Sequence, residues 1–212
     1  MAQLEAVVLI LVIVANFVTL GTGRLTTCIR AVALQGFLLG LLPVVLHAGW
    51  SLHQIGLAAG TIAVKAVLLP RFLLWAIRET AIRREVEPRV GYVASLLLGA
   101  AGLAIAFAVA GRLPLPEQAA ALLVPVALAT VIMGLVVLTT RRKAVNQVVG
   151  YLMLENGIYL FGLTQTERVP FLVEVGVLLD IFVAVFIMGI VVFHINREFD
   201  SIDSARLAEL AE

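Results

Sequence analysis

Three ionisable residues lie inside long apolar stretches of the sequence: Lys65, Glu155 and Asp180. A charged side chain at the centre of a bilayer costs about 2.5–3.5 kcal/mol on insertion scales, and apolar packing does not call for it. Such groups pair with one another or with a partner subunit, and they move protons or bind ions. We therefore expect these three residues to form the functional centre of the protein.

Membrane-spanning helices must position these residues. The chain has 212 residues, 62% of them hydrophobic, and a mean hydropathy of +1.08, whereas globular domains are about 45–50% apolar. A spanning helix needs about 20 mostly apolar residues. The sequence predicts an all-α integral membrane bundle of seven transmembrane helices, over residues 4–20, 29–46, 55–77, 90–110, 119–138, 145–163 and 171–194.

The distribution of Lys and Arg predicts the orientation of this bundle. If the N-terminus lies outside, twelve basic residues fall in the cytoplasmic connections and tail, and only Arg112 and Arg168 fall outside. Basic residues favour cytoplasmic loops. We therefore predict an outer N-terminus and a cytoplasmic C-terminus.

Helix geometry places the three ionisable residues at a common depth. At about 1.5 Å per residue, Lys65, Glu155 and Asp180 each lie roughly 15–18 Å from the predicted start of their helix, near the middle of a ~30 Å hydrocarbon core. Glu174 lies only about 6 Å deep by the same count. It could reach the outer interface and form the mouth of a path to Asp180.

Each of these residues has a structural interpretation beside the functional one. Glu155 and Asp180 are expected to exchange protons, because burial disfavours the charged form of a carboxyl; the alternative is a fixed, hydrogen-bonded structural group. Lys65 is either a structural counter-ion or a charge that biases its partner. Pro70 follows five residues later, and a kink there would make room for water.

Several polar residues are predicted to support this centre. Asn156 and Tyr159 stand beside Glu155 and could bind its carboxyl or a water, while His194 is either an interface anchor or an entry point for protons. Asn16 and Gln35 predict hydrogen bonds between helices. Close helix packing is predicted at Gly150 and Gly157.

Composition argues against other functions. The formal net charge of +1 gives no basic footprint for nucleic acid. Cys28 is the single cysteine and the three histidines are scattered, so we expect no metal site, no iron–sulfur cluster and no cofactor in this chain. Nucleotide and phosphate-binding fingerprints are also absent from the sequence.

Two segments, RRKAVNQVVGYLMLENGIYLFGL and VEVGVLLDIFVAVFIMGIVVFHINREFDSID, resemble component E of hydrogenase-4, a family of membrane subunits of formate hydrogenlyase-type complexes. The lysine before the proline of the third helix agrees with this resemblance. The C-terminal half is also similar to the K-type subunit of respiratory complex I and to the C subunit of multisubunit cation antiporters. Asp180 aligns with the second K-type glutamate, and Glu155 lies about one helical turn after the first.

The internal spacing of the sequence, together with the resemblance of its C-terminal half to the K-type subunit, predicts a single membrane domain with internal units. Residues 1–78 would form a first three-helix unit, 79–118 a linking fourth helix, 119–197 a K-subunit-like three-helix unit, and 198–212 a cytoplasmic tail. A spacing of about 118 residues relates Arg24, which opens the second helix, to Arg142, which opens the sixth, and indicates that the two three-helix units are an internal duplication.

The resemblance also implies a function, in a bacterial or archaeal cytoplasmic membrane. The chain would be a non-redox, non-catalytic subunit of a complex I-like membrane-bound hydrogenase. It would contact antiporter-like and other membrane-arm subunits and, through its cytoplasmic loops, a peripheral nickel–iron and iron–sulfur arm. Its ion path would use Glu155, Asp180, Lys65 and Glu174 to move protons or sodium. The alternatives are a subunit of a multisubunit cation/proton antiporter and a structural scaffold of the membrane arm.

Overall fold

The structure is a computed structural model that describes residues 2–46, 52–79, 90–113, 122–164 and 182–189. The elements in these residues are helices, and a helical segment at 182–189 follows the last of them. They are α1 (Ala2–Gly21), α2 (Leu25–Leu46), α3 (Leu52–Thr61), the π-helix η1 (Ile62–Leu68), α4 (Leu69–Glu79), α5 (Tyr92–Ala110), α7 (Leu123–Thr140) and α8 (Ala144–Leu163).

The all-helical fold agrees with the prediction. With α3, η1 and α4 counted as one run, the described residues form seven helices, and the first six begin and end within four residues of their predicted bounds. The predicted seventh helix is described only over residues 182–189. Within the described part of the chain, five helices are long and apolar enough to cross a membrane. The protein is a multi-pass membrane protein.

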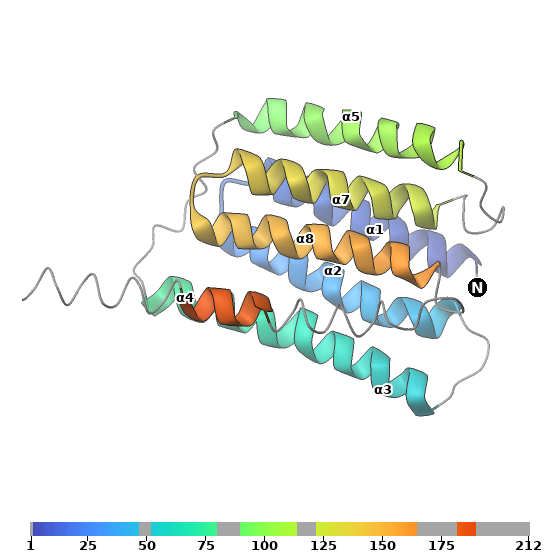
Figure 1. Cartoon of the computed structure of the whole chain (residues 1–212), viewed down its shortest axis with the longest axis horizontal. Helices are drawn as coiled ribbons and strands as arrows, with labels where there is room; N and C mark the ends of the chain where they lie inside the picture. Colours follow the sequence, from blue (N-terminus) through green and yellow to red (C-terminus); the bar gives the residue numbers. More distant parts are fainter. Residues whose placement is uncertain (1, 47–51, 80–89, 114–121, 165–181, 190–212) are drawn as a thin grey trace, which may run out of the picture.

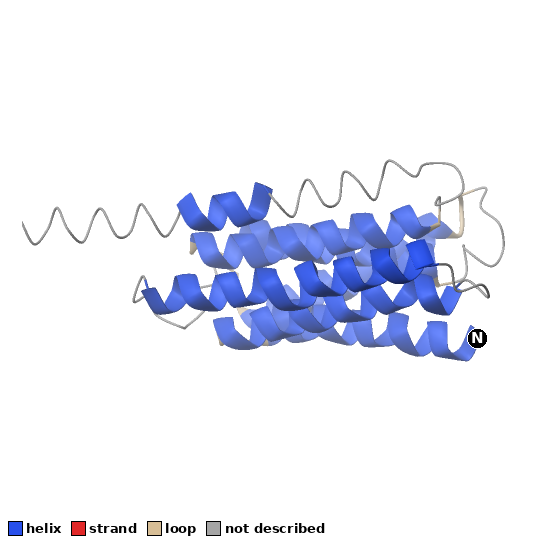
Figure 2. Ribbon diagram, turned by 90° about the horizontal axis from the view of Figure 1, so that it is seen from below, coloured by secondary structure: helices blue, strands red, loops and turns tan. Residues whose placement is uncertain are grey.

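The helices lie side by side along one axis, and consecutive long helices run in opposite directions (Figures 1 and 2). α1, α2, α7 and α8 form the centre of the bundle. α5 packs on α7 and α1 at one edge, while the run from α3 to α4 packs on α2 at the other. The segment 182–189 lies beside α4 (Figure 1).

The interior contains two apolar clusters with a polar layer between them. One cluster joins the ends of α1 and α7 to the starts of α2 and α8, together with α4 and the segment 182–189. The other joins the opposite ends of α1, α2, α7 and α8. The residues of the polar layer are buried and come from five elements: Asn16, Gln35, Lys65, Thr130, Glu155 and Asn156. Lys65 and Glu155 therefore lie at the same level of the bundle, in the polar layer between the two apolar clusters.

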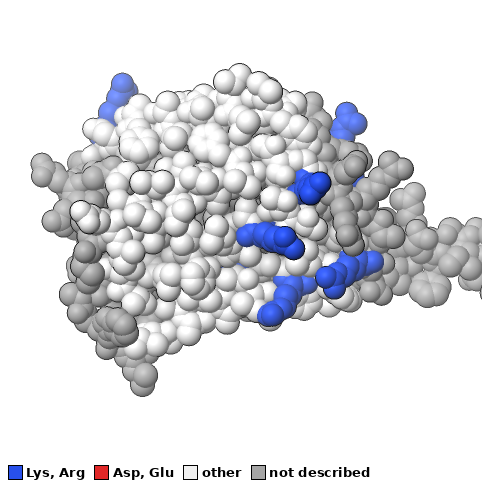
Figure 3. All heavy atoms as spheres, turned by 180° about the vertical axis from the view of Figure 1, so that it is seen from behind, with Lys and Arg blue, Asp and Glu red and all other residues white. Residues whose placement is uncertain are grey.

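The outer surface is apolar where a bilayer or a partner helix would contact it. On α5, Val93, Leu97 and Ile105 are each more than half exposed. Basic side chains gather at one end of the bundle, where α1 leads into α2 and α7 leads into α8 (Figure 3). Arg112 follows α5 and lies at the opposite end.

Candidate functional site

Lys65 and Glu155 form an ion pair in the polar layer. The Nζ atom of Lys65 donates a hydrogen bond to Oε1 of Glu155 over 2.6 Å, and the two side chains are 5% and 2% exposed. The lysine comes from η1 and the glutamate from α8, so the pair joins two helices that are 90 residues apart in sequence. The structure thus shows a partner for Lys65 within its own chain.

The helix that carries Lys65 widens into a π-helix at this point. The backbone N–H of Leu69 donates to the carbonyl of Val64, five residues earlier, instead of four. Pro70 comes next, and a proline inside an α-helix lacks an N–H group and collides with the carbonyl four residues before it. The wider turn relieves that conflict, and π-turns of this kind are frequent at functional sites.

Close contact between α7 and α8 fixes the position of Glu155. A Cβ atom placed on Gly134 would lie 2.5 Å from the backbone nitrogen of Leu154, and one on Gly157 would lie 2.7 Å from that of Val131. Gly150 makes the reciprocal contact with Leu138. The predicted close packing at Gly150 and Gly157 is confirmed, and it holds the α8 backbone directly against α7 on both sides of Glu155.

A chain of hydrogen-bonded side chains continues from α8 through the bundle. Asn156 donates to Gln35 over 3.3 Å, Gln35 to Asn16 over 2.6 Å, and Asn16 to the hydroxyl of Thr130 over 2.9 Å. Thr130 then donates to the carbonyl of Val126. We call Asn156, Gln35, Asn16 and Thr130 the amide chain. It links α8, α2, α1 and α7, and it confirms the interhelical hydrogen bonds predicted for Asn16 and Gln35.

Asn156 and Tyr159, the residues predicted to support Glu155, point toward different partners. Asn156 directs its amide nitrogen to Gln35 in α2. The ring of Tyr159 lies one turn beyond Glu155, with the Lys65 ammonium 5.9 Å from its centroid, which is within the range of a cation–π contact. Tyr159 therefore faces the cation of the pair.

Chemically, the pair and the amide chain differ. An ammonium and a carboxylate in contact can exchange a proton, and the protonation of each depends on the charge of the other. Side-chain amides are neutral hydrogen-bond donors and acceptors, and they neither gain nor lose a proton near neutral pH. Among the described residues of the polar layer, Lys65 and Glu155 are the basic and acidic side chains, and the others are amides and a hydroxyl.

Arg141 lies in the connection between α7 and α8, as the sequence predicts, but it is buried there, with its side chain only 1% exposed. Its Nη2 atom donates over 2.8 Å to the carbonyl of Leu20, and its guanidinium lies 5.5 Å from the ring centroid of Tyr92. Burial lowers the pKa of this guanidinium, with Cys28 and Tyr92 acting in the opposite direction. The side chain caps the end of α1, since the last carbonyls of a helix have no partner within the helix.

The sequence did not predict the buried hydrogen bonds of Thr130 and Arg141. It also did not predict the close contact of α2, at Gly36 and Gly40, with η1. Thr130 is one hydroxyl in an apolar helix, and Arg141 is the first of three consecutive basic residues, so neither pattern distinguishes a buried role. The G-x-x-x-G pattern of Gly36 and Gly40 was a usable signal, because it is typical of helices whose backbones approach closely in membranes.

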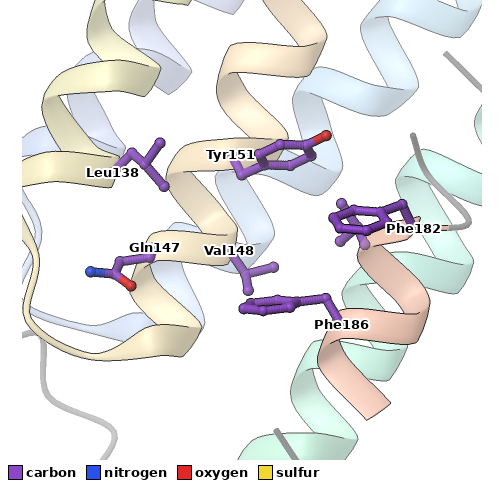
Figure 4. Close-up of a pocket in the computed structure, with 7 residues that line it drawn as sticks. Leu138, Gln147, Val148, Tyr151, Phe182 and Phe186 are labelled. Carbon is purple, nitrogen blue, oxygen red and sulfur yellow. The ribbon is translucent and has the colours of Figure 1, made fainter. Parts of the chain in front are cut away.

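A cavity of about 220 Å³ lies away from the ion pair. It is bounded by α7, α8 and the segment 182–189, with Tyr151, Phe182 and Phe186 on its walls (Figure 4). Its lining is almost entirely apolar, and the side chains of Lys65 and Glu155 do not border it. Among the described residues that line the cavity, none is a carboxylate, a lysine, an arginine or a histidine.

Asp180, Glu174 and His194 lie outside the described residues, so their predicted roles remain predictions. In the ranges that the structure covers, no group of three His, Cys, Asp or Glu side chains is placed to hold a metal ion.

Comparison with known proteins gives two levels of similarity. The chain is 35% identical over 193 residues to uncharacterized protein Rv0085 of Mycobacterium tuberculosis, which covers 89% of this chain and 87% of that protein. It is 28% identical over 156 residues to hydrogenase-4 component E of Escherichia coli K12, and equally to that of Shigella flexneri, covering 72% of this chain and 71% of theirs. No protein-family model matches the chain. No solved structure matches it significantly.

Proposed function

Because this chain belongs to the same family as Rv0085 and shares weaker similarity with hydrogenase-4 component E, we propose that it is a non-redox membrane subunit of a membrane-bound hydrogenase complex. In this complex it would contribute to the movement of protons or sodium ions coupled to electron transfer. The name of the second relative supports the complex, and the buried Lys65–Glu155 pair supports the ion movement.

The pair provides a simple mechanism for storing and releasing charge. With Lys65 protonated and Glu155 ionised, the pair is neutral overall, and each charge compensates the other in the low-dielectric interior. A proton that reaches Glu155 neutralises the carboxylate and leaves the Lys65 ammonium uncompensated. That imbalance favours release of a proton from the pair to the next group along the path, which we propose to be Asp180. Glu174 would connect Asp180 to the outer interface, and His194 would be an entry point near the cytoplasm.

The orientation belongs to the same proposal. The basic residues at the α1–α2 and α7–α8 end of the bundle (Figure 3) support a cytoplasmic location for that end, since Lys and Arg favour the cytoplasmic side. The N-terminus would then lie outside. Antiporter-like membrane subunits and a peripheral nickel–iron arm would be the partners, in a bacterial or archaeal cytoplasmic membrane.

The test is Glu155→Gln in the complex, reconstituted into lipid vesicles. Glutamine keeps an acceptor for Lys65 but does not titrate, so we expect the complex to assemble and its coupled ion movement to fall, measured with a pH-sensitive dye. Glu5→Gln is the matched control, because Glu5 is a partly exposed carboxyl in the first turn of α1. Normal ion movement by the Glu155→Gln complex would contradict the proposal.

The identity of the complex has a separate test. Purification in mild detergent followed by mass spectrometry is expected to recover a nickel–iron protein with this chain. Recovery of antiporter subunits alone would favour the cation antiporter instead.

One observation favours a structural scaffold as a second candidate. The contact between Lys65 and Glu155 is short and buried, and a fixed ion pair of that kind can specify how helices pack without moving ions. The two candidates separate on replacement of both partners by apolar residues, which a scaffold would tolerate and an ion path would not.

A further inference from the structure

Two adjacent residues of α2, Gln35 and Gly36, contact the two helices that carry the ion pair. Gln35 is fully buried and accepts a hydrogen bond from Asn156, the residue that follows Glu155 on α8. Gly36 faces the other helix, where a Cβ atom on it would lie 2.7 Å from Cβ, 2.8 Å from C and 2.9 Å from O of Lys65. The two helices that carry the pair are thus both fixed against one point on α2.

We infer that Gln35 and Gly36 are positioning residues for the Lys65–Glu155 pair: Gly36 seats the π-helical turn of Lys65, and Gln35 sets the rotation of α8 through Asn156. This inference deepens the proposed function, and it rests on that proposal only where ion movement is concerned. The geometry itself is independent of what the pair does.

The role of Gly36 follows from which atoms it meets. Backbone atoms of Lys65 cannot rotate away as the end of a flexible side chain can, so any side chain at position 36 must push η1 outward. Gly40, four residues later in the same G-x-x-x-G pattern, first meets the side-chain atom Cγ1 of Ile62. A methyl group at position 40 would therefore first collide with the side chain of Ile62. A methyl group at position 36 would collide with the backbone of Lys65 and displace that residue.

The role of Gln35 follows from the direction of its hydrogen bonds. Its carbonyl oxygen accepts from Asn156 and its amide nitrogen donates to Asn16, so it holds α8 on one side and α1 on the other. Glu155 and Asn156 are consecutive residues of one helix and rotate together about its axis. A rotation of α8 that breaks the bond from Asn156 to Gln35 therefore also turns Glu155 away from Lys65. Thr130 stands at the far end of the amide chain and holds Asn16. Its loss leaves the bond from Asn156 to Gln35 in place.

The experiment measures the infrared absorption of the Glu155 carboxyl in the full-length chain in lipid nanodiscs, assigned by subtracting the spectrum of Glu155→Gln. Gly36→Ala and Gln35→Met are expected to shift this band or to convert carboxylate absorption into carboxylic acid absorption. Gly60→Ala, whose new methyl meets open space, and Thr130→Val are the matched controls and are expected to leave it unchanged. Gly40→Ala is expected to shift it less than Gly36→Ala.

An unchanged band in both Gly36→Ala and Gln35→Met would overturn the inference, and so would equal shifts in the controls. Gln35→Met keeps the volume of the side chain and serves alone if Gly36→Ala does not fold. Ion movement is then measured on the same variants within the complex. A band shift in these variants together with normal ion movement in Glu155→Gln would uphold the positioning role while removing the proposed function.

Discussion

The ion pair and the amide chain meet at consecutive residues of α8 and yet behave differently. Glu155 faces η1 and holds an ammonium, whereas Asn156 faces α2 and joins a row of neutral groups. Both regions solve the same problem, which is to satisfy polar side chains that the bilayer cannot hydrate. One does so with charges that can be separated and neutralised, and the other with hydrogen bonds that can only be made or broken.

This difference assigns separate tasks to two sides of the bundle. The amide chain fixes α1, α2, α7 and α8 relative to one another. The ion pair connects that fixed group to η1, where a π-turn and a proline make the helix irregular. We therefore expect variants in the pair to affect charge movement most. Gln35 and Asn156 connect the amide chain to the pair, whereas a variant at the far end of the amide chain, at Thr130, should affect stability alone.

The largest effect is expected from Lys65→Met. Removing one partner of a buried ion pair leaves an uncompensated charge and costs about 3–5 kcal/mol, so the folded fraction of the chain should fall. The free energy of unfolding in detergent, followed by circular dichroism, measures this cost. Lys65→Met combined with Glu155→Leu should recover most of the loss. Equal losses in the single and double variants would show that the uncompensated charge of Glu155 is not what destabilises Lys65→Met.

A smaller effect is expected where the two regions share a backbone contact. Gly134→Ala places a methyl group 2.5 Å from the backbone nitrogen of Leu154, and overpacking of this kind costs about 1–3 kcal/mol. Both the amide chain, through α7, and the ion pair, through α8, should be disturbed. The control is Gly189→Ala, which meets open space, and comparable thermal stability of the two variants would contradict the packing described.

The smallest effect is expected within the amide chain. Thr130→Val removes one interhelical hydrogen bond, and such bonds in membranes contribute about 0.6 kcal/mol on average and at most about 1.7. Unfolding in detergent should show a loss in that range. Coupled ion movement by the complex should be unchanged, and a large fall in it would show that the hydroxyl of Thr130 belongs to the ion path.

The sequence predicted the helices well because membrane thickness dictates their length. Apolar runs of about 20 residues have few alternatives in lipid, and the bounds of α1 and α8 differ from the prediction by no more than two residues. The common depth of Lys65 and Glu155 was predictable for a related reason, although the sequence left open which group pairs with Lys65. Charges at equal depth in an apolar interior must find compensating groups, and helical rise alone showed that these two lie at one level.

Other features depend on rotation about the helix axis and could not be predicted in this way. Depth does not reveal that Asn156 turns toward α2 while Glu155 turns toward η1, because two consecutive residues are separated by about 100° around the helix. The burial of Arg141 depends on how close the end of α1 approaches, which no local pattern encodes. The π-helix at Lys65 could not be predicted either, because Pro70 can be accommodated by a kink or by a wider turn, and the sequence does not show which. Asp180 lies outside the described residues, so its role stays a prediction.

The most direct test of the central claim is coupled ion movement by the complex that carries Lys65→Met together with Glu155→Leu. Two apolar residues of similar volume should allow the chain to fold and the complex to assemble. If protons or sodium ions pass through this pair, vesicles that contain the double variant will show electron transfer with little or no coupled ion movement. Ion movement at the level of the unaltered complex would contradict the account and leave the pair as a structural contact.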